Sequence, residues 1–312
     1  MKKERRFIMI EIIATAESVE QAKKLVDIGI DTIYIGQDEF GLRLPYSFSK
    51  EQVKEITEYA HDKKKKVCVA VNAIMHNDRI KTVVPYLQYL EEIGVDVITV
   101  GDPGVIHLMK KHELKIPYIY DAHTLVTSAK QINFWAKRGA VGAVLAREIM
   151  YEELKQLQAD VTIPTEILVY GATCIHQSKR PLVENYFRFT KEKKTTGKGL
   201  FISEPKDPST HYSIYEDING THIFATDDIN LMPQLEKLVD INLTTWKLDG
   251  IFTKGNAFVQ IAELFVKAKQ AFEQKQWSEQ LKQQLNEQVI QLHPEDRTLN
   301  EGFFLKDPSE VQ

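Results

Sequence analysis

Cysteine is scarce in this sequence, which has only Cys68 and Cys174 among its 312 residues. Two thiols exclude a disulfide scaffold, and they also exclude a zinc or iron–sulfur site held by cysteines of this chain alone. Cys68 lies between Val67 and Val69 in an apolar run, so we expect it to be a core residue. Cys174 follows another apolar run and needs separate consideration.

Long hydrophobic runs and an excess of charge of one sign are also lacking. No run approaches the roughly 18 apolar residues of a membrane span. The N-terminus, MKKERRFIMIEIIATAES, is basic and then apolar, but its short apolar part carries Glu11 and no A-x-A context, which indicates a strand and not a signal peptide. The net charge of −4 excludes a generally basic coat and leaves room for a local RNA-binding patch. We therefore expect a globular, cytoplasmic protein with no membrane partner.

Short apolar strand patterns and amphipathic helix patterns alternate eight times over residues 7–275. Eight such units are the number that closes a parallel barrel, so we predict a TIM-like (β/α)8 barrel of the α/β class. An open doubly wound sheet is the alternative, but it would need G-x-G-x-x-G where the chain has ATAESVE after the first strand. The predicted strands are Phe7–Ala14, Thr32–Ile35, Val67–Val71, Val95–Val100, Pro117–Tyr120, Val141–Ala146, a seventh that starts at Thr165 and stops at Gly171, and Thr244–Leu248.

Two segments fall outside this alternation. Residues 179–228 are too long for a barrel loop, and strand-like pieces at Tyr212–Ile214 and His222–Ala225 predict a small, otherwise irregular β insertion that covers the barrel mouth. Its basic piece, Lys191–Lys198, is interpreted as a solvated loop, with a contact to a phosphate backbone as the alternative. Residues 276–312 are predicted to form a C-terminal helix and a tail that dock on the barrel.

Polar side chains follow the strands at their C-terminal ends, which share one rim in a barrel. No H-x-H pair or carboxylate bridge stands out among them, so no metal site is predicted. The candidate catalytic residues are Arg147, Glu148, Lys247 and Asp249; the candidate substrate-binding residues are Asn72, Asp121, His123, Tyr170, Cys174 and His176.

Several of these candidates have two interpretations. Cys174 and His176 lie two apart on an extended strand and could form a nucleophile–base pair, whereas the simpler interpretation makes Cys174 a half-buried small hydrophobe. Lys247 and Asp249 share a face by strand alternation, so they either pair with each other or leave Lys247 to bind an anionic substrate. Arg147 and its neighbour Glu148 are expected to point in different directions, and either one suits a structural ion pair.

Four segments carry a resemblance to a known family. VLAREIMYEEL (Val144–Leu154), EILVYGATCIHQS (Glu166–Ser178), HIFATDDINL (His222–Leu231) and TTWKLDG (Thr244–Gly250) resemble peptidase family U32, once called collagenase-like proteases. The resemblance covers nearly the whole chain. It implies a TIM-like barrel and one of two activities: the proteolysis recorded in the family name, or the oxygen-independent hydroxylation by relatives that act on a ubiquinone precursor, ribosomal RNA or the wobble uridine of tRNA. The tRNA relatives depend on prephenate.

The chain departs from the family pattern at the residues that hold an iron–sulfur cluster in the hydroxylating relatives. Cys174 matches the first of four cysteines, but Pro181 and Asn230 stand at two of the other positions and the insertion has no cysteine. One thiolate cannot hold such a cluster. The family's K-[IL]-E-G-R signature is here Lys247-Leu-Asp-Gly-Ile251, and Tyr170 replaces a histidine.

These losses resemble a short member that works beside a longer, cysteine-complete homologue. The resemblance implies a cluster-less subunit in the formation of 5-hydroxyuridine at tRNA position 34, with tRNA and that homologue as partners. On this hypothesis the chain binds no cofactor on its own, prephenate is a co-substrate of the pathway and the cluster belongs to the partner. A peptidase and a non-catalytic scaffold of the same family remain the alternatives.

Overall fold

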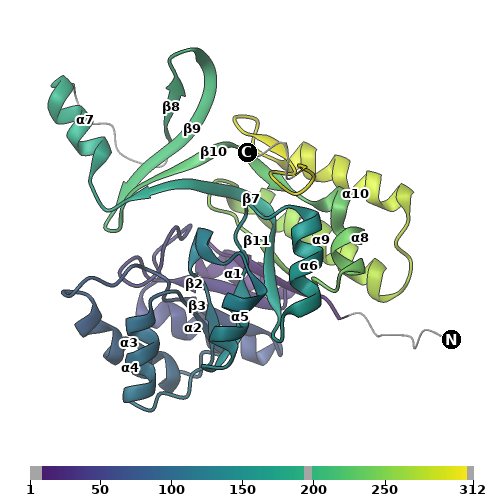
Figure 1. Cartoon of the computed structure of the whole chain (residues 1–312). Coiled ribbons are helices and arrows are strands. Elements are labelled where there is room, and N and C mark those ends of the chain that lie inside the picture. The colour runs from purple at the N-terminus through teal and green to yellow at the C-terminus, as the bar shows by residue number, and fades with distance from the viewer. Residues whose placement is uncertain (1–8, 193–198, 308–312) are drawn as a thin grey trace.

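The computed structural model describes residues 9–192 and 199–307, and within them eight parallel strands close into a barrel (Figure 1). Each strand pairs with the next along the chain, and β11 pairs with both β1 and β7, which closes the ring. The predicted barrel is confirmed. Its strands are β1 (Glu11–Thr15), β2 (Thr32–Gly36), β3 (Lys66–Ala70), β4 (Val97–Val100), β5 (Tyr118–Tyr120), β6 (Ala140–Val144), β7 (Thr165–Ser178) and β11 (Thr245–Leu248).

Helices connect these strands on the outside of the barrel, and local sequence explains where they begin. The Ser18 and Ser49 hydroxyls accept hydrogen bonds from the backbone N–H groups of Gln21 and Gln52, which satisfies otherwise free donors at two helix starts. The helices that follow the barrel strands are α1 (Val19–Asp27), α2 (Lys50–Asp62), α3 (Ile80–Glu92), α4 (Pro103–Lys111), α5 (Ala129–Ala136), α6 (Tyr151–Asp160), α8 (Leu235–Asp240) and α9 (Gly255–Glu273), with short 3-10 turns η1 (His123–Leu125) and η2 (Met232–Gln234).

One continuous apolar core lies between the barrel strands and this helical layer. All five residues of β2 are buried, as expected for a parallel strand covered on both faces. Trp246 of β11 is fully buried and its indole N–H donates to the carbonyl of Leu243 at 3.0 Å. None of the described helices is long and apolar enough to cross a membrane. The predicted first strand is wrong in its start, because β1 begins at Glu11; Phe7 and Ile8 lie outside the described residues.

Strand β7 does not stop at Gly171 as the sequence suggested. It continues to Ser178 because the strand changes partners: before Gly171 it pairs with β6 and β11, and from Tyr170 onward it pairs antiparallel with β10. Gly171 makes this change possible with a φ of +123°. A Cβ atom at this position would lie 2.3 Å from the carbonyl oxygen of Asp249.

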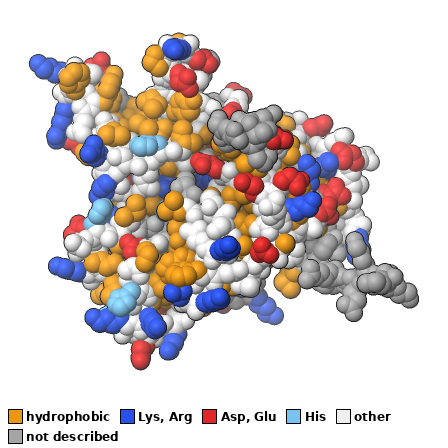
Figure 2. Space-filling model, viewed as in Figure 1, with side chains coloured by type: hydrophobic (Ala, Val, Ile, Leu, Met, Phe, Trp, Pro, Cys, Tyr) orange, Lys and Arg blue, Asp and Glu red, His pale blue; other side chains and the backbone are white. Residues whose placement is uncertain are grey.

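The continuation of β7 belongs to a projecting unit that we call the arm, formed by the described residues of 172–230. Besides β7 it contains α7 (Leu182–Thr190), β8 (Leu200–Glu204), β9 (Asp207–Asp217) and β10 (Gly220–Asn230). The predicted β pieces are present, whereas α7 was not predicted. Of the basic piece Lys191–Lys198, residues 193–198 lie outside the described residues. Figure 2 shows hydrophobic side chains gathered over the arm, where Tyr186, Phe189 and Phe201 are exposed.

Contacts at the turn between β9 and β10 join the arm to the barrel loops. The Asn219 side-chain amide donates to the carbonyl oxygens of Asp38 at 2.9 Å and Gly41 at 3.3 Å. Arg79 donates to the Asn219 side-chain oxygen at 2.5 Å and to the carbonyl of Ile218 at 2.6 Å. These bonds hold the arm beside the C-terminal ends of the barrel strands.

The C-terminal segment contacts both the helical layer and the arm. It contains α10 (Glu279–Leu292), which packs on α9, and β12 (Thr298–Asn300), which pairs with β10. Arg297 is buried and donates to Asp228 of β10 at 2.9 and 2.5 Å. Phe304 packs against Tyr151 of α6 with ring centroids 5.3 Å apart.

Candidate functional site

A cavity of about 80 Å³ lies at the C-terminal ends of the barrel strands, beside the arm. That volume holds several waters or a small polar group. Eight of the ten candidate residues from the sequence line it, and they come from strands far apart in the chain. These eight are Asn72, Asp121, His123, Arg147, Glu148, Cys174, Lys247 and Asp249.

Arg43 and His123 form the hydrogen-bonded pair on one side of the cavity. The Arg43 guanidinium donates to His123 Nδ1 at 2.5 Å, and His123 Nε2 lies 3.0 Å from the carbonyl oxygen of Asn72. A donor at one ring nitrogen and an acceptor at the other select the neutral tautomer with the proton on Nε2. Burial and the Arg43 charge lower the pKa of His123 to about 4, so this ring is neutral at physiological pH.

Both members of this pair have left-handed backbone conformations, with φ of 55° for Arg43 and 56° for His123. Such conformations are uncommon for non-glycine residues and concentrate at binding and catalytic sites. Arg43 was not among the candidate residues. It lies in the loop after β2, seven residues beyond the last residue of that strand, so no strand end pointed to it.

Asp121 is held as a carboxylate by its neighbours. Its oxygens accept from the Asn72 side-chain amide at 2.5 Å and from the His123 backbone N–H at 3.1 Å. Burial opposes ionisation, but the Asn72 amide, the charge of Arg43 and the hydrogen bond from the His123 backbone N–H together lower the pKa of Asp121. This corner of the cavity therefore keeps one negative charge beside a guanidinium and a neutral imidazole.

The floor of the cavity contains a buried charge pair. Lys247 Nζ lies 3.5 Å from a carboxylate oxygen of Glu166, and it sits 3.1 Å from the centroid of the Tyr34 ring. Burial raises the pKa of Glu166, while Lys247 acts to lower it. Glu166 was missed, although a glutamate directly before the apolar run Ile167–Tyr170 of a buried strand is a recognisable exception to the strand pattern.

Lys247 and Asp249 both line the cavity but do not pair with each other, so that interpretation was wrong. Asp249 instead faces Arg147, whose Nη2 lies 3.6 Å from its Oδ2. Arg147 also donates to the carbonyl oxygen of Ala172 on the arm. Of the two neighbours Arg147 and Glu148, Arg147 therefore takes part in a structural ion pair, whereas Glu148 is exposed at the cavity edge.

Tyr170 and His176 do not reach the cavity, which corrects two predictions. Lys247 of β11 pairs with Leu168, but the next residue, Leu248, pairs with Tyr170. Strand β7 therefore has one extra residue at this point, which reverses the expected alternation of side chains at Tyr170. The Tyr170 hydroxyl is buried outside the barrel, 2.8 Å from His293 Nδ1 and 2.9 Å from the Thr253 hydroxyl. His176 lies further along the arm, where its side chain is exposed.

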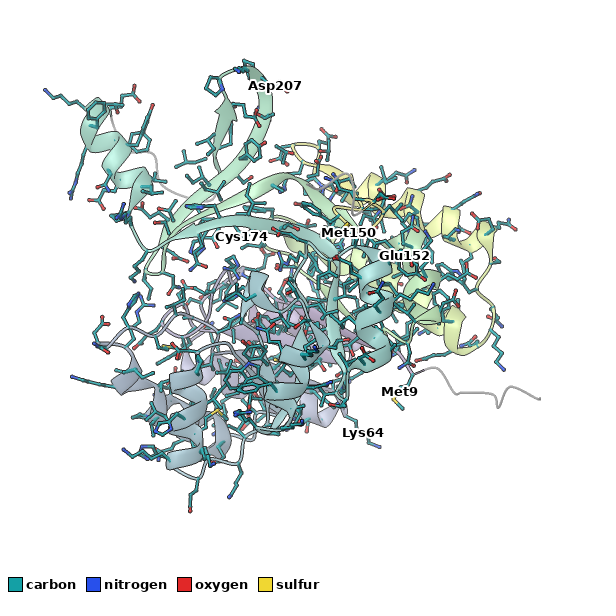
Figure 3. All side chains as sticks on the ribbon, viewed as in Figure 1. Met9, Lys64, Met150, Glu152, Cys174 and Asp207 are labelled. Carbon is teal, nitrogen blue, oxygen red and sulfur yellow. The ribbon has the colours of Figure 1, made fainter. Side chains whose placement is uncertain are left out.

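Cys174 lies on the part of β7 that leaves the barrel (Figure 3) and lines the cavity from the arm. Its thiol interacts with the imidazole of His222 on β10, whereas the His176 side chain is exposed, so the interpretation that paired Cys174 with His176 does not hold. The thiol donates to the carbonyl oxygen of His176 at 3.3 Å. Sequence distance hid His222 because it is 48 positions away and meets Cys174 only through the antiparallel pairing of β7 and β10.

The residues at the cluster positions do not fit a four-thiolate cluster. Asn230 is engaged on both sides: its amide donates to Asn286 at 2.8 Å and its oxygen accepts from the Met232 N–H at 3.1 Å. Pro181 stands at the start of α7 and offers no ligand atom. Cys68 is fully buried in β3, and no group of three or more potential metal-ligating His, Cys, Asp or Glu residues occurs in the part of the chain that the structure describes.

Comparison with known proteins gives consistent matches. The model for "Peptidase family U32" matches residues 17–312. "tRNA hydroxylation protein P2" of Bacillus subtilis (strain 168) is 32% identical over 303 residues, which is 95% of this chain and 98% of that protein. "tRNA hydroxylation protein P1" of the same organism is 24% identical and covers 87% of this chain and 67% of that protein. "23S rRNA 5-hydroxycytidine C2501 synthase" of Escherichia coli (strain K12) is 24% identical over 77% of this chain, which spans 36% of that protein.

Proposed function

The chain belongs to peptidase family U32, and from that premise we propose that it acts in the hydroxylation of tRNA. The observation that carries the proposal is the match to the Bacillus subtilis tRNA hydroxylation protein P2 over nearly the full length of both chains. Membership of the family alone would leave proteolysis open, since the family is named for it. The hydroxylation names of several relatives favour RNA modification.

The finer form of the proposal is the formation of 5-hydroxyuridine at position 34 of tRNA. The rRNA relative from Escherichia coli is named for hydroxylation at carbon 5 of another pyrimidine, which supports the same ring position here. Prephenate is the proposed co-substrate of the pathway. A dicarboxylate of this kind needs cationic partners, and Arg43, Arg147 and Lys247 line the cavity.

We assign the cavity residues as follows. Arg147, Glu148, Lys247 and Asp249 are the residues proposed to act on the reacting groups. Asn72, Asp121, His123 and Cys174 are proposed to contact the substrate. Lys247 forms a buried ion pair with Glu166. Removing two charges from water costs several kcal/mol of folding free energy, so such a pair is more easily explained as part of a functional site than as a source of stability.

We further propose that the chain is the cluster-less subunit beside a longer, cysteine-complete homologue. Bacillus subtilis has both a P1 and a P2 protein of tRNA hydroxylation, and this chain covers all but a small part of P2 and about two thirds of P1. Tyr186 and Phe189 of the arm are exposed, with exposed fractions of 57% and 88%, and large exposed aromatic side chains are typical of contact surfaces. The arm is the surface we propose for the partner.

The decisive experiment removes the gene from its host and measures tRNA nucleosides by mass spectrometry, in a strain without any redundant hydroxylation route. We expect hydroxylated uridine at position 34 to disappear and to return when the native chain is supplied. Unchanged hydroxyuridine in the deletion strain would refute the proposal. Co-purification of the longer homologue with the native chain, and its loss with a Tyr186→Asp, Phe189→Asp variant, tests the partner separately.

A further inference from the structure

A thiol, an imidazole and a carboxylate stand in series on the arm, one from each of three adjacent antiparallel strands. They are Cys174 of β7, His222 of β10 and Asp217 at the end of β9. Asp217 Oδ1 lies 3.0 Å from His222 Nε2, and His222 in turn interacts with the Cys174 thiol. This is the order in which a nucleophile, its base and the group that orients the base occur in cysteine-dependent sites.

The hydrogen bond to Asp217 fixes the state of the imidazole. A carboxylate at Nε2 requires the proton there, which leaves the lone pair of the neutral ring on Nδ1. Nδ1 is buried with no hydrogen-bond partner among the described residues, and the His222 side chain has an exposed fraction of 0%. A buried acceptor without a donor is costly to keep, and the side chain that interacts with this ring on the side away from Asp217 is the Cys174 thiol. Hydrogen bonds between a nucleophile and its base are often long in the absence of substrate and shorten when it binds.

The surroundings favour the thiolate. Burial acts to raise the pKa of Cys174, but the interaction with His222 and the charges of Arg43 and Arg147 outweigh it and lower that pKa. Burial acts to lower the pKa of His222, but Asp217 and Cys174 raise it. Cys68 is the contrasting thiol, since it is fully buried in the barrel and burial raises its pKa. Only Cys174 opens onto the cavity.

We propose that Cys174, with His222 as its base and Asp217 as the positioning residue, is a nucleophile that adds to carbon 6 of a pyrimidine base in RNA. The choice of substrate rests on the proposed function, because hydroxylation at carbon 5 needs that carbon to become electron-rich. The cavity offers donors in Arg43 and Arg147 and acceptors in Asp121 and Asp249, which suits the polar edge of a base that has left its stack.

The addition balances without any oxidant. The thiol proton moves to His222 Nδ1, a bond forms between Sγ and carbon 6, and the electron pair of the C5=C6 bond moves toward the exocyclic group at carbon 4. Carbon 5 is then nucleophilic and takes a proton from solvent. Loss of a proton from carbon 5 and departure of the thiolate restore the aromatic ring. In D2O this reversible cycle replaces the hydrogen on carbon 5 with deuterium.

The test incubates the purified chain, together with the longer homologue where the two co-purify, with tRNA from the deletion strain in D2O. Mass spectrometry of the nucleosides then measures deuterium at carbon 5. We expect exchange with the native chain and with Cys68→Ala, none above background with Cys174→Ser, and a rate about 100-fold lower with His222→Gln, the usual effect of losing a general base. Asp217→Asn provides a second variant if His222→Gln does not fold, which its thermal unfolding shows.

The outcomes separate this inference from the proposed function. No exchange with the native chain, or equal exchange with Cys174→Ser, overturns the inference. Hydroxylated tRNA in the deletion strain that carries Cys174→Ser also overturns the inference but leaves the proposed function standing. Hydroxylated tRNA in the deletion strain without any copy of the gene overturns the proposed function. Hydrolysis of casein that Cys174→Ser abolishes, without pyrimidine exchange, assigns the same thiol to peptides and overturns the choice of substrate.

Discussion

At the scale of single residues, the protonation state of His123 in the cavity is set by its burial and by the charge of Arg43. Arg43 donates to His123 Nδ1, so a second proton on that ring would face a guanidinium directly. The charge of Arg43 and the burial of the ring act in the same direction on the pKa of His123. Asp121 opposes them from 3.6 Å, but it does not outweigh them. The cavity is therefore sensitive to acid at a defined side chain.

We predict that His123 makes folding stability fall at mildly acidic pH. Its folded-state pKa of about 4 lies below the ordinary value of 6.5, so the unfolded chain binds the proton first as the pH drops. The stabilisation is complete above 6.5 and is lost as the pH falls toward 4, and by pH 5 the loss is about 2 kcal/mol. Urea unfolding at pH 7.5 and pH 5 measures it.

The matched variant is His123→Gln, which keeps a polar side chain and removes the titration. Burial also lowers the pKa of His293 to about 4, so both proteins lose some stability with acid and only the difference between them reports on His123. An identical loss in the native chain and the variant would contradict the prediction.

At the scale of elements, β7 is the strand that turns a plain barrel into one with an arm. It pairs with β6 and β11 inside the barrel and then with β10 outside it. The change occurs at Gly171, where the backbone is left-handed and the Asp249 backbone passes close by. The same change places Cys174 above the cavity and brings His222 beside it. One glycine therefore couples the fold of the arm to the candidate site.

Gly171→Ala is predicted to destabilise the protein by about 3 kcal/mol, because the new Cβ combines an unfavourable φ with a clash against fixed backbone. The control is Gly199→Ala on the arm, where a Cβ meets nothing within 4 Å and no positive φ applies. We expect the control to change stability little. Thermal unfolding of the two variants compares them, and similar melting temperatures would show that the clash at Gly171 relaxes without cost.

At the scale of the whole molecule, the barrel, the arm and the C-terminal segment hold one another in place. Arg297 of the C-terminal segment reaches Asp228 of β10, while Asn219 at the turn of the arm contacts the loop after β2. The positions that match cluster ligands of the relatives lie in the arm and hold Pro181 and Asn230, whose side chain is hydrogen-bonded to Asn286 and to the Met232 N–H. These two positions therefore supply no thiolate for a cluster.

This arrangement predicts a colourless protein with iron well below one atom per chain, even when it is expressed with ample iron and purified without oxygen. Iron analysis and visible absorption of the native chain measure this. The longer homologue purified in parallel is the positive control. A brown preparation of the native chain would contradict the prediction. If its iron persists in Cys174→Ala, other residues bind the iron; if the iron is lost in that variant, Cys174 is a ligand.

The sequence by itself determined the barrel, the rim and most of the candidate residues. Strand and helix periodicity depends on near neighbours, and the C-terminal ends of parallel strands must meet at one rim, so Asn72, Asp121 and Lys247 were found without coordinates. The family resemblance likewise depends on the order of residues along the chain. Residue identity alone also established that four thiolates are not available.

Only the tertiary structure decided which side chains meet. A one-residue register shift in β7 moved Tyr170 out of the cavity, and no local pattern announces such a shift. Arg43 enters from a loop with a left-handed backbone, and Asp217 and His222 reach Cys174 through antiparallel pairing over more than forty positions. The physical reason is the same in each case: local propensity fixes the elements, whereas register, bulges and loop conformation result from packing between distant segments.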